Sequence, residues 1–112
     1  MPTILVTGVA GFIGMSVADA LLARGDTVVG IDVLNDYYDP ALKQARLARL
    51  TQRHGERFTF LRVDFADATA LRSALAPHAF DRIIHLGAQA GVRYSIENPE
   101  AYGQSNLVGH LN

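Results

Sequence analysis

Short apolar runs alternate with longer amphipathic stretches along the whole chain. The runs are Thr3–Val6, Val28–Ile31, Arg57–Val63 and Ile83–Leu86. Each is short and rich in branched or aromatic side chains, which is typical of buried β-strands. The stretches that separate them are long enough for helices. The pattern therefore predicts a strand followed by a helix, repeated four times.

Residues that commonly begin or end helices define the bounds of the predicted helices. These helices run from about Phe12 to Arg24, from Ala41 to about His54, from Asp67 through Leu75 and Ala76 to the break at Pro77, and from about Asn98-Pro99-Glu100 onward. Gly25 and Gly55 follow the first two, as C-terminal caps commonly do. Asp39 and Asp67 precede the second and third, where an aspartate can cap the first turn. The apolar face expected for the first helix comprises Ile13, Val17, Ala20 and Leu21.

Strands joined by helical crossovers form parallel sheets with helices on both faces and right-handed connections. The sequence therefore predicts a doubly wound α/β fold of Rossmann type, with strand order 3-2-1-4. In such folds a ligand lies in the crevice at the carboxyl ends of the strands, where the strand order reverses. The predicted crevice lies between the first and fourth strands. The candidate residues below all fall at strand carboxyl ends.

The turn between the first strand and first helix carries a glycine pattern. Gly8, Gly11 and Gly14 are spaced G-x-x-G-x-x-G and surround Phe12 and Ile13. Bare backbone N–H groups at a helix N-terminus suit a pyrophosphate, because a Cβ atom at the closest approach would push it away. The pattern therefore indicates a dinucleotide site. A glycine-rich turn without a ligand is the alternative.

An aspartate ends the second strand at the distance that such a site requires. Asp32 lies 18 residues after Gly14 (32 − 14), close to the spacing of about 20 in Rossmann dinucleotide sites. A carboxylate there accepts hydrogen bonds from the adenosine ribose hydroxyls and repels the 2′-phosphate of NADP. Asp32 therefore favours NAD. The alternative is a strand-end aspartate that only caps a turn.

Composition narrows the classes of function. The 112 residues are enough for one domain, 49% are hydrophobic, and the formal net charge is −1, which argues against a nucleic-acid surface. There is no cysteine, and no apolar run approaches the roughly 18 residues of a membrane span. The first strand begins too early for a signal peptide, so a cytoplasmic protein is expected. Arg46, Arg49 and Arg53 are interpreted as a solvated helix face, and His85 as a core histidine.

The motifs resemble those of a known group of enzymes. Thr7–Gly14 resembles the T-G-x-x-G-F-I-G signature of the extended short-chain dehydrogenases/reductases, a family of NAD-dependent epimerases and dehydratases. Gly30–Asp39, His85–Ser95 and Ser105–Gly109 resemble more narrowly the UDP-glucuronate 4-epimerases. The resemblance covers the whole chain but about the first third of such an enzyme. Two positions depart from the pattern: Val33 stands where many members carry Asn, and Gly87 where they carry Ala.

The resemblance implies a role for each matched residue. Gly8, Gly11, Phe12, Ile13 and Gly14 would hold the NAD pyrophosphate, Asp32 the adenosine ribose, Asp64 and Phe65 the adenine, and Leu86, Gly87 and Ala88 the nicotinamide-side ribose. Gln89 and Arg93 would face the sugar nucleotide. Arg93 suits a glucuronate carboxylate or a phosphate, since a guanidinium binds either in bidentate fashion, although it is otherwise an ordinary surface arginine. Asn106 matches a position near the catalytic lysine.

The catalytic Tyr-x-x-x-Lys pair of such enzymes does not occur in the 112 residues. The only lysine is Lys43, which Asp39 precedes at that spacing. We therefore expect an NAD-binding Rossmann domain over 1–112, truncated before the catalytic pair and the sugar-binding domain, and inactive alone. The implied function is interconversion of UDP-glucuronate and UDP-galacturonate through a 4-keto intermediate, within polysaccharide biosynthesis, by a homodimeric parent protein. A related nucleotide-sugar decarboxylase or dehydratase, or a non-catalytic NAD-binding module, are the alternatives.

Overall fold

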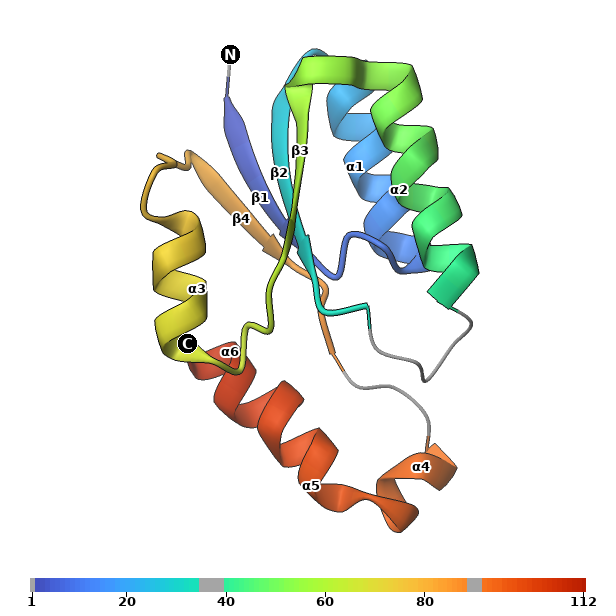
Figure 1. The fold of residues 1–112 in the computed structure, drawn as a ribbon, viewed down its shortest axis with the longest axis vertical. Coiled ribbons are helices and arrows are strands. Elements are labelled where there is room, and N and C mark those ends of the chain that lie inside the picture. The colour runs from blue at the N-terminus through green and yellow to red at the C-terminus, as the bar shows by residue number, and fades with distance from the viewer. Residues whose placement is uncertain (1, 35–39, 89–91) are drawn as a thin grey trace.

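Four parallel strands form a single sheet in the computed structural model, which describes residues 2–34, 40–88 and 92–112. The strands are β1 (Thr3–Thr7), β2 (Thr27–Asp32), β3 (Phe58–Arg62) and β4 (Arg82–His85). Their order across the sheet is β3-β2-β1-β4 (Figure 1). The doubly wound α/β fold and the strand order predicted from the sequence are therefore confirmed.

Helices cover both faces of the sheet. On one face lie α1 (Phe12–Ala23) and α2 (Pro40–His54), and on the other lies α3 (Ala68–Leu75) (Figure 1). A short 3₁₀ turn, η1 (Gly55–Arg57), leads from α2 into β3. The Asp67 side chain accepts a hydrogen bond from the Ala70 N–H, which confirms Asp67 as the N-cap of α3. The predicted cap Asp39 lies outside the described residues.

Two hydrophobic cores, one on each face, hold these layers together. The core under α1 and α2 consists of Ile4, Val6, Val9, Ala10, Ala18, Leu22, Val28, Leu47, Leu50 and Phe58. The core under α3 consists of Leu5, Val29, Ile31, Val63 and Phe65, with partly buried side chains of α3 packed against it. Alternate residues of β1 and β2 enter opposite cores, because successive side chains of a strand point to opposite faces.

The buried face of α1 is shifted from the predicted face along the helix. The buried residues are Gly14, Ala18 and Leu22. None of the four residues expected there is fully buried: Ile13 is 63% exposed, Ala20 is exposed, and Val17 and Leu21 are partly buried. The reason is the contact at the start of the helix. A Cβ atom at Gly14 would lie 2.0 Å from the Gly8 carbonyl oxygen, so only a glycine face can pack against the preceding turn. That contact sets which residues of α1 point inward.

The C-terminal segment is more irregular than predicted. Helix α5 (Pro99–Tyr102) begins where a helix was expected, and the Asn98 side chain caps it by accepting a hydrogen bond from the Ala101 N–H. The helical run then passes through a π-helical turn, η2 (Gly103–Val108), into α6 (Gly109–Leu111). The sequence pattern did not predict η2, nor the short helix α4 (Val92–Glu97) before it. π-Helical turns are rare and occur often at functional sites.

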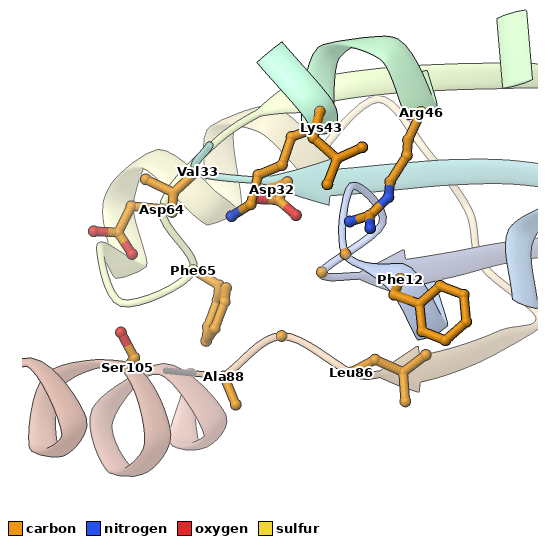
Figure 2. Close-up of a pocket in the computed structure, with 14 residues that line it drawn as sticks. Phe12, Asp32, Val33, Lys43, Arg46, Asp64, Phe65, Leu86, Ala88 and Ser105 are labelled. Atoms are coloured by element: carbon orange, nitrogen blue, oxygen red, sulfur yellow. The ribbon is translucent and has the colours of Figure 1, made fainter. Parts of the chain in front are cut away.

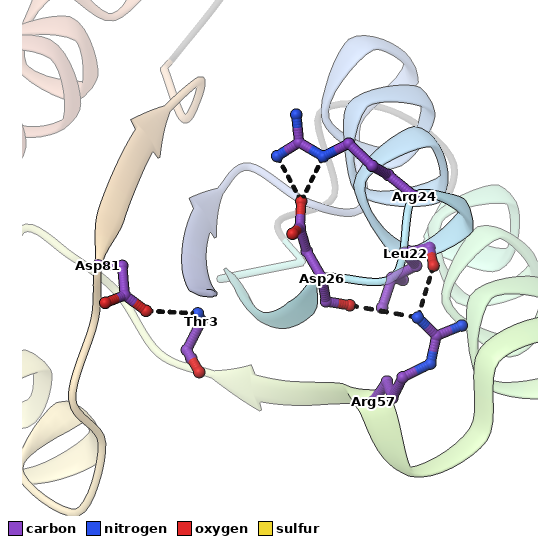
Figure 3. A network of polar contacts seen from close by, with 6 residues as sticks. All are labelled: Thr3, Leu22, Arg24, Asp26, Arg57 and Asp81. Atoms are coloured by element: carbon purple, nitrogen blue, oxygen red, sulfur yellow. Dashed lines mark hydrogen bonds and ion pairs between the residues drawn. The ribbon is translucent and has the colours of Figure 1, made fainter. Parts of the chain in front are cut away.

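Polar contacts secure the amino ends of the strands, opposite the predicted crevice (Figure 3). The Thr3 N–H donates to the Asp81 carboxylate at 2.7 Å, which joins the start of β1 to the segment before β4. Asp26, which is buried, pairs with Arg24, and the Arg57 guanidinium donates to the Leu22 carbonyl at 2.6 Å. These contacts support the sheet at the end away from the predicted site.

An ion-paired cluster joins the two helices on the same face. Asp19 of α1 accepts hydrogen bonds from Arg53 at 2.8 Å and interacts with His54 Nε2 at 2.7 Å, both from α2. The hydrogen bond with His54 is the main cause that lowers the pKa of Asp19, and Arg53 adds to it.

Among the described residues, no helix is both long and apolar enough to cross a membrane.

Candidate functional site

A cavity of about 360 Å³ lies at the carboxyl ends of the strands (Figure 2). The parallel register brings these ends together, since Thr7 of β1 stands opposite both Ile31 of β2 and His85 of β4. The cavity is lined by Gly8, Gly11, Phe12, Asp32, Val33, Leu42, Lys43, Arg46, Asp64, Phe65, Leu86, Gly87, Ala88 and Ser105. The cavity is therefore at the topological switch point that the fold predicts.

The turn after β1 presents backbone to this cavity. Gly8 has φ +69°, a left-handed conformation that glycine adopts without strain, and its N–H donates to the Ile31 carbonyl. A Cβ atom at Gly8 would lie 2.9 Å from the Cα atom of Gly87, so the turns after β1 and β4 approach each other too closely for a side chain there. The Gly11 N–H then closes the turn onto the Gly8 carbonyl at 3.0 Å.

Asp32 is buried at the end of β2 and oriented by backbone donors. One carboxylate oxygen accepts from the Ala10 N–H at 3.1 Å and the other from the Leu34 N–H at 2.9 Å. Leu34 has φ 57°, so the chain turns sharply away directly after the strand. Each carboxylate oxygen can accept more than one hydrogen bond. Asp32 therefore keeps acceptor capacity on the cavity side while its position is fixed.

Thr7 connects the end of β1 to the end of β4. Its hydroxyl oxygen accepts hydrogen bonds from the N–H groups of Leu86 and Gly87, both at 2.9 Å. The hydroxyl oxygen also lies within hydrogen-bond distance of Nδ1 of His85, at 2.6 Å. Burial lowers the pKa of His85, and the nearby His110 lowers it further. His85 is half-buried and hydrogen-bonded, which agrees with the prediction of a structural histidine.

Phe65 forms the floor between the two ends of the cavity. A Cβ atom at Gly87 would lie 2.7 Å from Cε1 of the ring, and one at Gly109 would lie 2.4 Å from Cε2. The ring also meets His85 edge-on, with centroids 5.2 Å apart. Phe65 is thus held between two glycines and a histidine, so its ring has little freedom to move.

Helix α2 supplies one wall of the cavity. Lys43 and Arg46 descend from this helix toward Asp32 and the glycine turn (Figure 2). The interpretation of Arg46 as part of a solvated face is wrong. Its guanidinium donates to the Ala10 carbonyl at 3.0 Å and is only partly exposed, because the approach of α2 to the turn covers it. Arg49, in contrast, is exposed as expected.

Most of the predicted cofactor residues meet at this cavity. Those that line it are Gly8, Gly11, Phe12, Asp32, Asp64, Phe65, Leu86, Gly87 and Ala88. Ile13 and Gly14 do not: Ile13 points to solvent, and Gly14 packs under the turn. Gln89 lies outside the described residues, and Arg93 belongs to α4, with its side chain outside the described part.

Five residues that line the cavity were not predicted as site residues from the sequence: Val33, Leu42, Lys43, Arg46 and Ser105. The spacing of Lys43 and Arg46 on one helix face was visible, but nothing in the sequence placed that face over the glycine turn. Ser105 lies in the π-helical turn, for which the sequence gives no signal. Among residues 2–34, 40–88 and 92–112, no cluster of three or more histidines, aspartates or glutamates is placed to hold a metal ion.

Comparison with known proteins agrees with this geometry. The UDP-glucuronate 4-epimerase 4 of Arabidopsis thaliana is 49% identical over 110 residues, covering 98% of this chain and 24% of the relative. The UDP-glucuronate 4-epimerase of Thermodesulfobacterium geofontis is 47% identical over 108 residues, covering 96% of this chain and 33% of the relative. The chain thus spans 24–33% of the length of these relatives.

Solved structures share the fold. A UDP-glucose 4-epimerase from Stenotrophomonas maltophila with bound NAD and formylated UDP-arabinopyranose has a TM-score of 0.83 at 28% identity, covering 99% of this chain and 32% of that chain. The Thermus thermophilus UDP-glucose 4-epimerase in complex with NAD has a TM-score of 0.77 at 32% identity, covering 97% and 31%. The family model described as GDP-mannose 4,6 dehydratase matches residues 5–112. The chain therefore belongs to the GDP-mannose 4,6 dehydratase family of NAD-dependent epimerases and dehydratases.

Proposed function

We propose that this chain is the NAD-binding part of a nucleotide-sugar 4-epimerase that interconverts UDP-glucuronate and UDP-galacturonate. The observation that carries the proposal is the cavity at the switch point, where a bare glycine turn and a buried carboxylate face the same space. UDP-glucuronate 4-epimerases of Arabidopsis thaliana and Thermodesulfobacterium geofontis are 46–49% identical to this chain, which favours that substrate over UDP-glucose.

The residues of the cavity fit the parts of NAD. Gly8 and Gly11 offer backbone with no side chain in the way, and the N-terminus of α1 adds the positive end of its dipole, as a pyrophosphate requires. Asp32 would accept from the adenosine ribose, and Phe65 would pack against the adenine. Leu86, Gly87 and Ala88 would adjoin the nicotinamide-side ribose. Ile13 and Gly14 would act indirectly, through the position of the turn.

The chemistry of the reaction would be divided between the cofactor and the protein. Bound NAD would supply the hydride acceptor for C4 of the sugar and return the hydride to the opposite face of the 4-keto sugar. The described residues would bind and orient the cofactor, while Gln89 and Arg93 would face the sugar nucleotide. A tyrosine and a lysine in Tyr-x-x-x-Lys spacing would move the hydroxyl proton, and no such pair occurs in these 112 residues.

Asp32 gives the cofactor proposal a direct test. Because the 2′-phosphate of NADP would meet the Asp32 carboxylate, the protein should bind NAD more tightly than NADP in isothermal titration calorimetry. Asp32→Asn keeps a side-chain acceptor but removes the charge, so it should reduce that preference about tenfold or more. Equal affinities of the unsubstituted protein for the two dinucleotides would contradict the proposal.

The reaction itself can be tested with the protein expressed as its gene encodes it. We expect UDP-glucuronate to give UDP-galacturonate with no loss of carbon dioxide, as followed by ¹H NMR. A pentose product would indicate a decarboxylase instead, and turnover of UDP-glucose alone would move the substrate to the neutral hexoses. The 112-residue chain by itself should give no turnover. A homodimeric assembly of the parent protein remains a prediction from the resemblance, and a cytoplasmic location remains a prediction from the sequence.

A further inference from the structure

Thr7 and His85 share a hydrogen bond whose direction the surrounding contacts fix. The Thr7 hydroxyl oxygen accepts hydrogen bonds from the N–H groups of Leu86 and Gly87, both at 2.9 Å. A hydroxyl oxygen has two lone pairs, and these two donors occupy both. At 2.6 Å from Nδ1 of His85, the hydroxyl can therefore only donate. It follows that Nδ1 carries no proton, so that His85 is neutral in this arrangement, with its proton on Nε2.

A second histidine lies beside His85. The ring of His110, from α6, is inclined at 51° to it, with the ring centroids 5.0 Å apart. We refer to these two residues as the histidine pair. Two imidazolium ions this close repel each other. Burial lowers the pKa of His85, and the charge of His110 lowers it further. The contact with Thr7 and the contact with His110 therefore both favour a neutral His85.

No opposite charge offsets this preference among the described residues. The groups that contact the His85 ring come from three elements: Thr7 from β1, Phe65 from the connection between β3 and α3, and His110 from α6. Only His110 among them can carry a charge. Asp64, next to Phe65, is exposed, and one of its oxygens accepts from the Ala66 N–H at 2.9 Å. Within residues 2–34, 40–88 and 92–112, no carboxylate forms an ion pair with either ring of the histidine pair.

His110 belongs to a helical run that closes one side of the cavity. This C-terminal run, residues 103–111, comprises η2 and α6, and its Ser105 lines the cavity (Figure 2). Gly109 packs on the Phe65 ring, where a Cβ atom would lie 2.4 Å from Cε2. Directly after the run, the Asn112 amide donates to the Phe65 carbonyl at 3.2 Å. The histidine pair lies within this same small interface, so charge on both rings would act on the packing of the run.

We propose that the histidine pair is an acid-sensitive contact, which holds the C-terminal run against the ends of β1 and β4 at neutral pH and releases it on protonation. When His85 takes up a proton, Nδ1 becomes a donor that faces the Thr7 oxygen, which has no free lone pair. The ring also gains the charge that a protonated His110 repels. Release would remove the cavity wall that carries Ser105. The inference goes beyond the proposed function and does not depend on NAD binding.

The direction of the pH effect and its range follow from the histidine. A histidine surrounded by water has a pKa near 6.5, and the pKa of His85 in the packed arrangement is lower. The released arrangement therefore binds the proton more strongly, and its population rises as the pH falls below about 6.5. Between about pH 7.5 and about pH 5.5, one such group can favour release by up to about tenfold.

Amide hydrogen exchange measures the release directly. In the protein expressed as its gene encodes it, exchange of residues 103–111, corrected for the intrinsic effect of pH, should be about three- to tenfold faster near pH 5.5 than near pH 7.5. His85→Asn keeps an acceptor for the Thr7 hydroxyl but cannot take up a proton, so its corrected rates at the two pH values should agree within about twofold. His78→Asn is the matched control, since His78 stacks on Phe80 before β4 begins, and it should keep the acceleration.

Two measurements keep the test decisive if His85→Asn does not fold. His110→Gln changes an exposed side chain, and it should reduce the acceleration about twofold or more, because the repelling charge is gone. The ¹⁵N chemical shifts of the His85 ring near pH 7.5 should show the neutral form with its proton on Nε2. A proton on Nδ1, an unsubstituted protein without acceleration, or an unchanged acceleration in either His85→Asn or His110→Gln would overturn the proposal.

Discussion

The contact between Gly87 and Phe65 leads to a prediction about coupled positions. Gly87 stands where many UDP-glucuronate 4-epimerases carry Ala. In this chain a Cβ atom at Gly87 would lie 2.7 Å from Cε1 and 3.1 Å from Cζ of the Phe65 ring. Ordinary contact between carbon atoms begins near 3.5 Å. Gly87→Ala therefore requires Phe65 to move by most of an ångström.

The ring cannot make that movement freely. The opposite edge of the ring lies against Gly109. A Cβ atom added at Gly109 would lie 2.4 Å from Cε2 and 2.5 Å from Cδ2 of Phe65. Phe65 is 8% exposed and meets His85 edge-on. We expect Gly87→Ala to lower the free energy of unfolding by about 1–3 kcal/mol, the usual cost of inserting a methyl group into a filled core.

A double-mutant cycle separates this clash from other effects. Phe65→Leu alone should also destabilise, because it leaves a void. Combined with Gly87→Ala, it should cost at least about 1 kcal/mol less than the sum of the two single changes, since the smaller side chain leaves room for the methyl group. The measurement is urea unfolding followed by circular dichroism. Gly103→Ala, a helical glycine with no atom within 4 Å of the added methyl group, is the control and should be neutral or stabilising.

Additive losses in the cycle would refute the reasoning, because they would show that the ring does not occupy the space of the methyl group. A neutral Gly87→Ala would refute it equally. If the coupling is found, the departure at Gly87 follows from the presence of Phe65, and the two positions must change together.

Three further predictions concern contacts around the same fold. Thr7→Val should lower the free energy of unfolding by about 2–4 kcal/mol, because the Leu86 and Gly87 N–H groups lose their acceptor, whereas Thr7→Ser should cost about 1 kcal/mol in the same urea assay; equal costs would contradict the role of the hydroxyl. Gly14→Ala should prevent native packing of α1, since the added methyl group would overlap backbone, and circular dichroism and thermal unfolding should show it; an unchanged midpoint would be the contrary result. Folding lowers the pKa of Asp19, so the ionised carboxylate stabilises the folded protein fully above about pH 4, and this stabilisation is lost as the pH falls below that value. Asp19→Asn should therefore lower the free energy of unfolding by about 0.3–1 kcal/mol at pH 7 and by less at pH 3, as measured by urea unfolding at both pH values.

The strands and their order could be predicted from sequence because each strand is a continuous apolar run. A strand that is buried on both faces needs such a run, and parallel connections leave few topologies to choose from. The face of α1 could not be predicted in the same way. Hydrophobic spacing favoured Ile13, but the contact between Gly14 and the Gly8 carbonyl determines the rotation of the helix. That contact joins two glycines, which hydropathy does not detect.

The candidate site likewise contains residues that motif spacing predicts and residues that only the tertiary packing reveals. Its glycine turn and Asp32 are close in sequence to the strand ends that position them, so motif spacing located them. Lys43 and Arg46 come from a helix whose position depends on how α2 packs against α1 and β3. Read as a sequence, they are basic residues on an amphipathic helix. Their role becomes visible only once the packing brings that face over the turn.

This division has a consequence for how such a site can vary. The end of the cavity proposed for the pyrophosphate is built mainly from backbone, and a Cβ atom added at Gly8 or Gly14 would lie 2.9 Å or less from other backbone atoms. Substitution at those positions disturbs the fold before it changes the ligand. The end of the cavity proposed for the adenosine ribose is lined by side chains of β2 and α2, which come together only through tertiary packing. The side chain at position 32 can therefore change while the turn stays the same. Differences in cofactor preference between relatives that share the glycine pattern should accordingly be found at the position of Asp32 rather than in the turn.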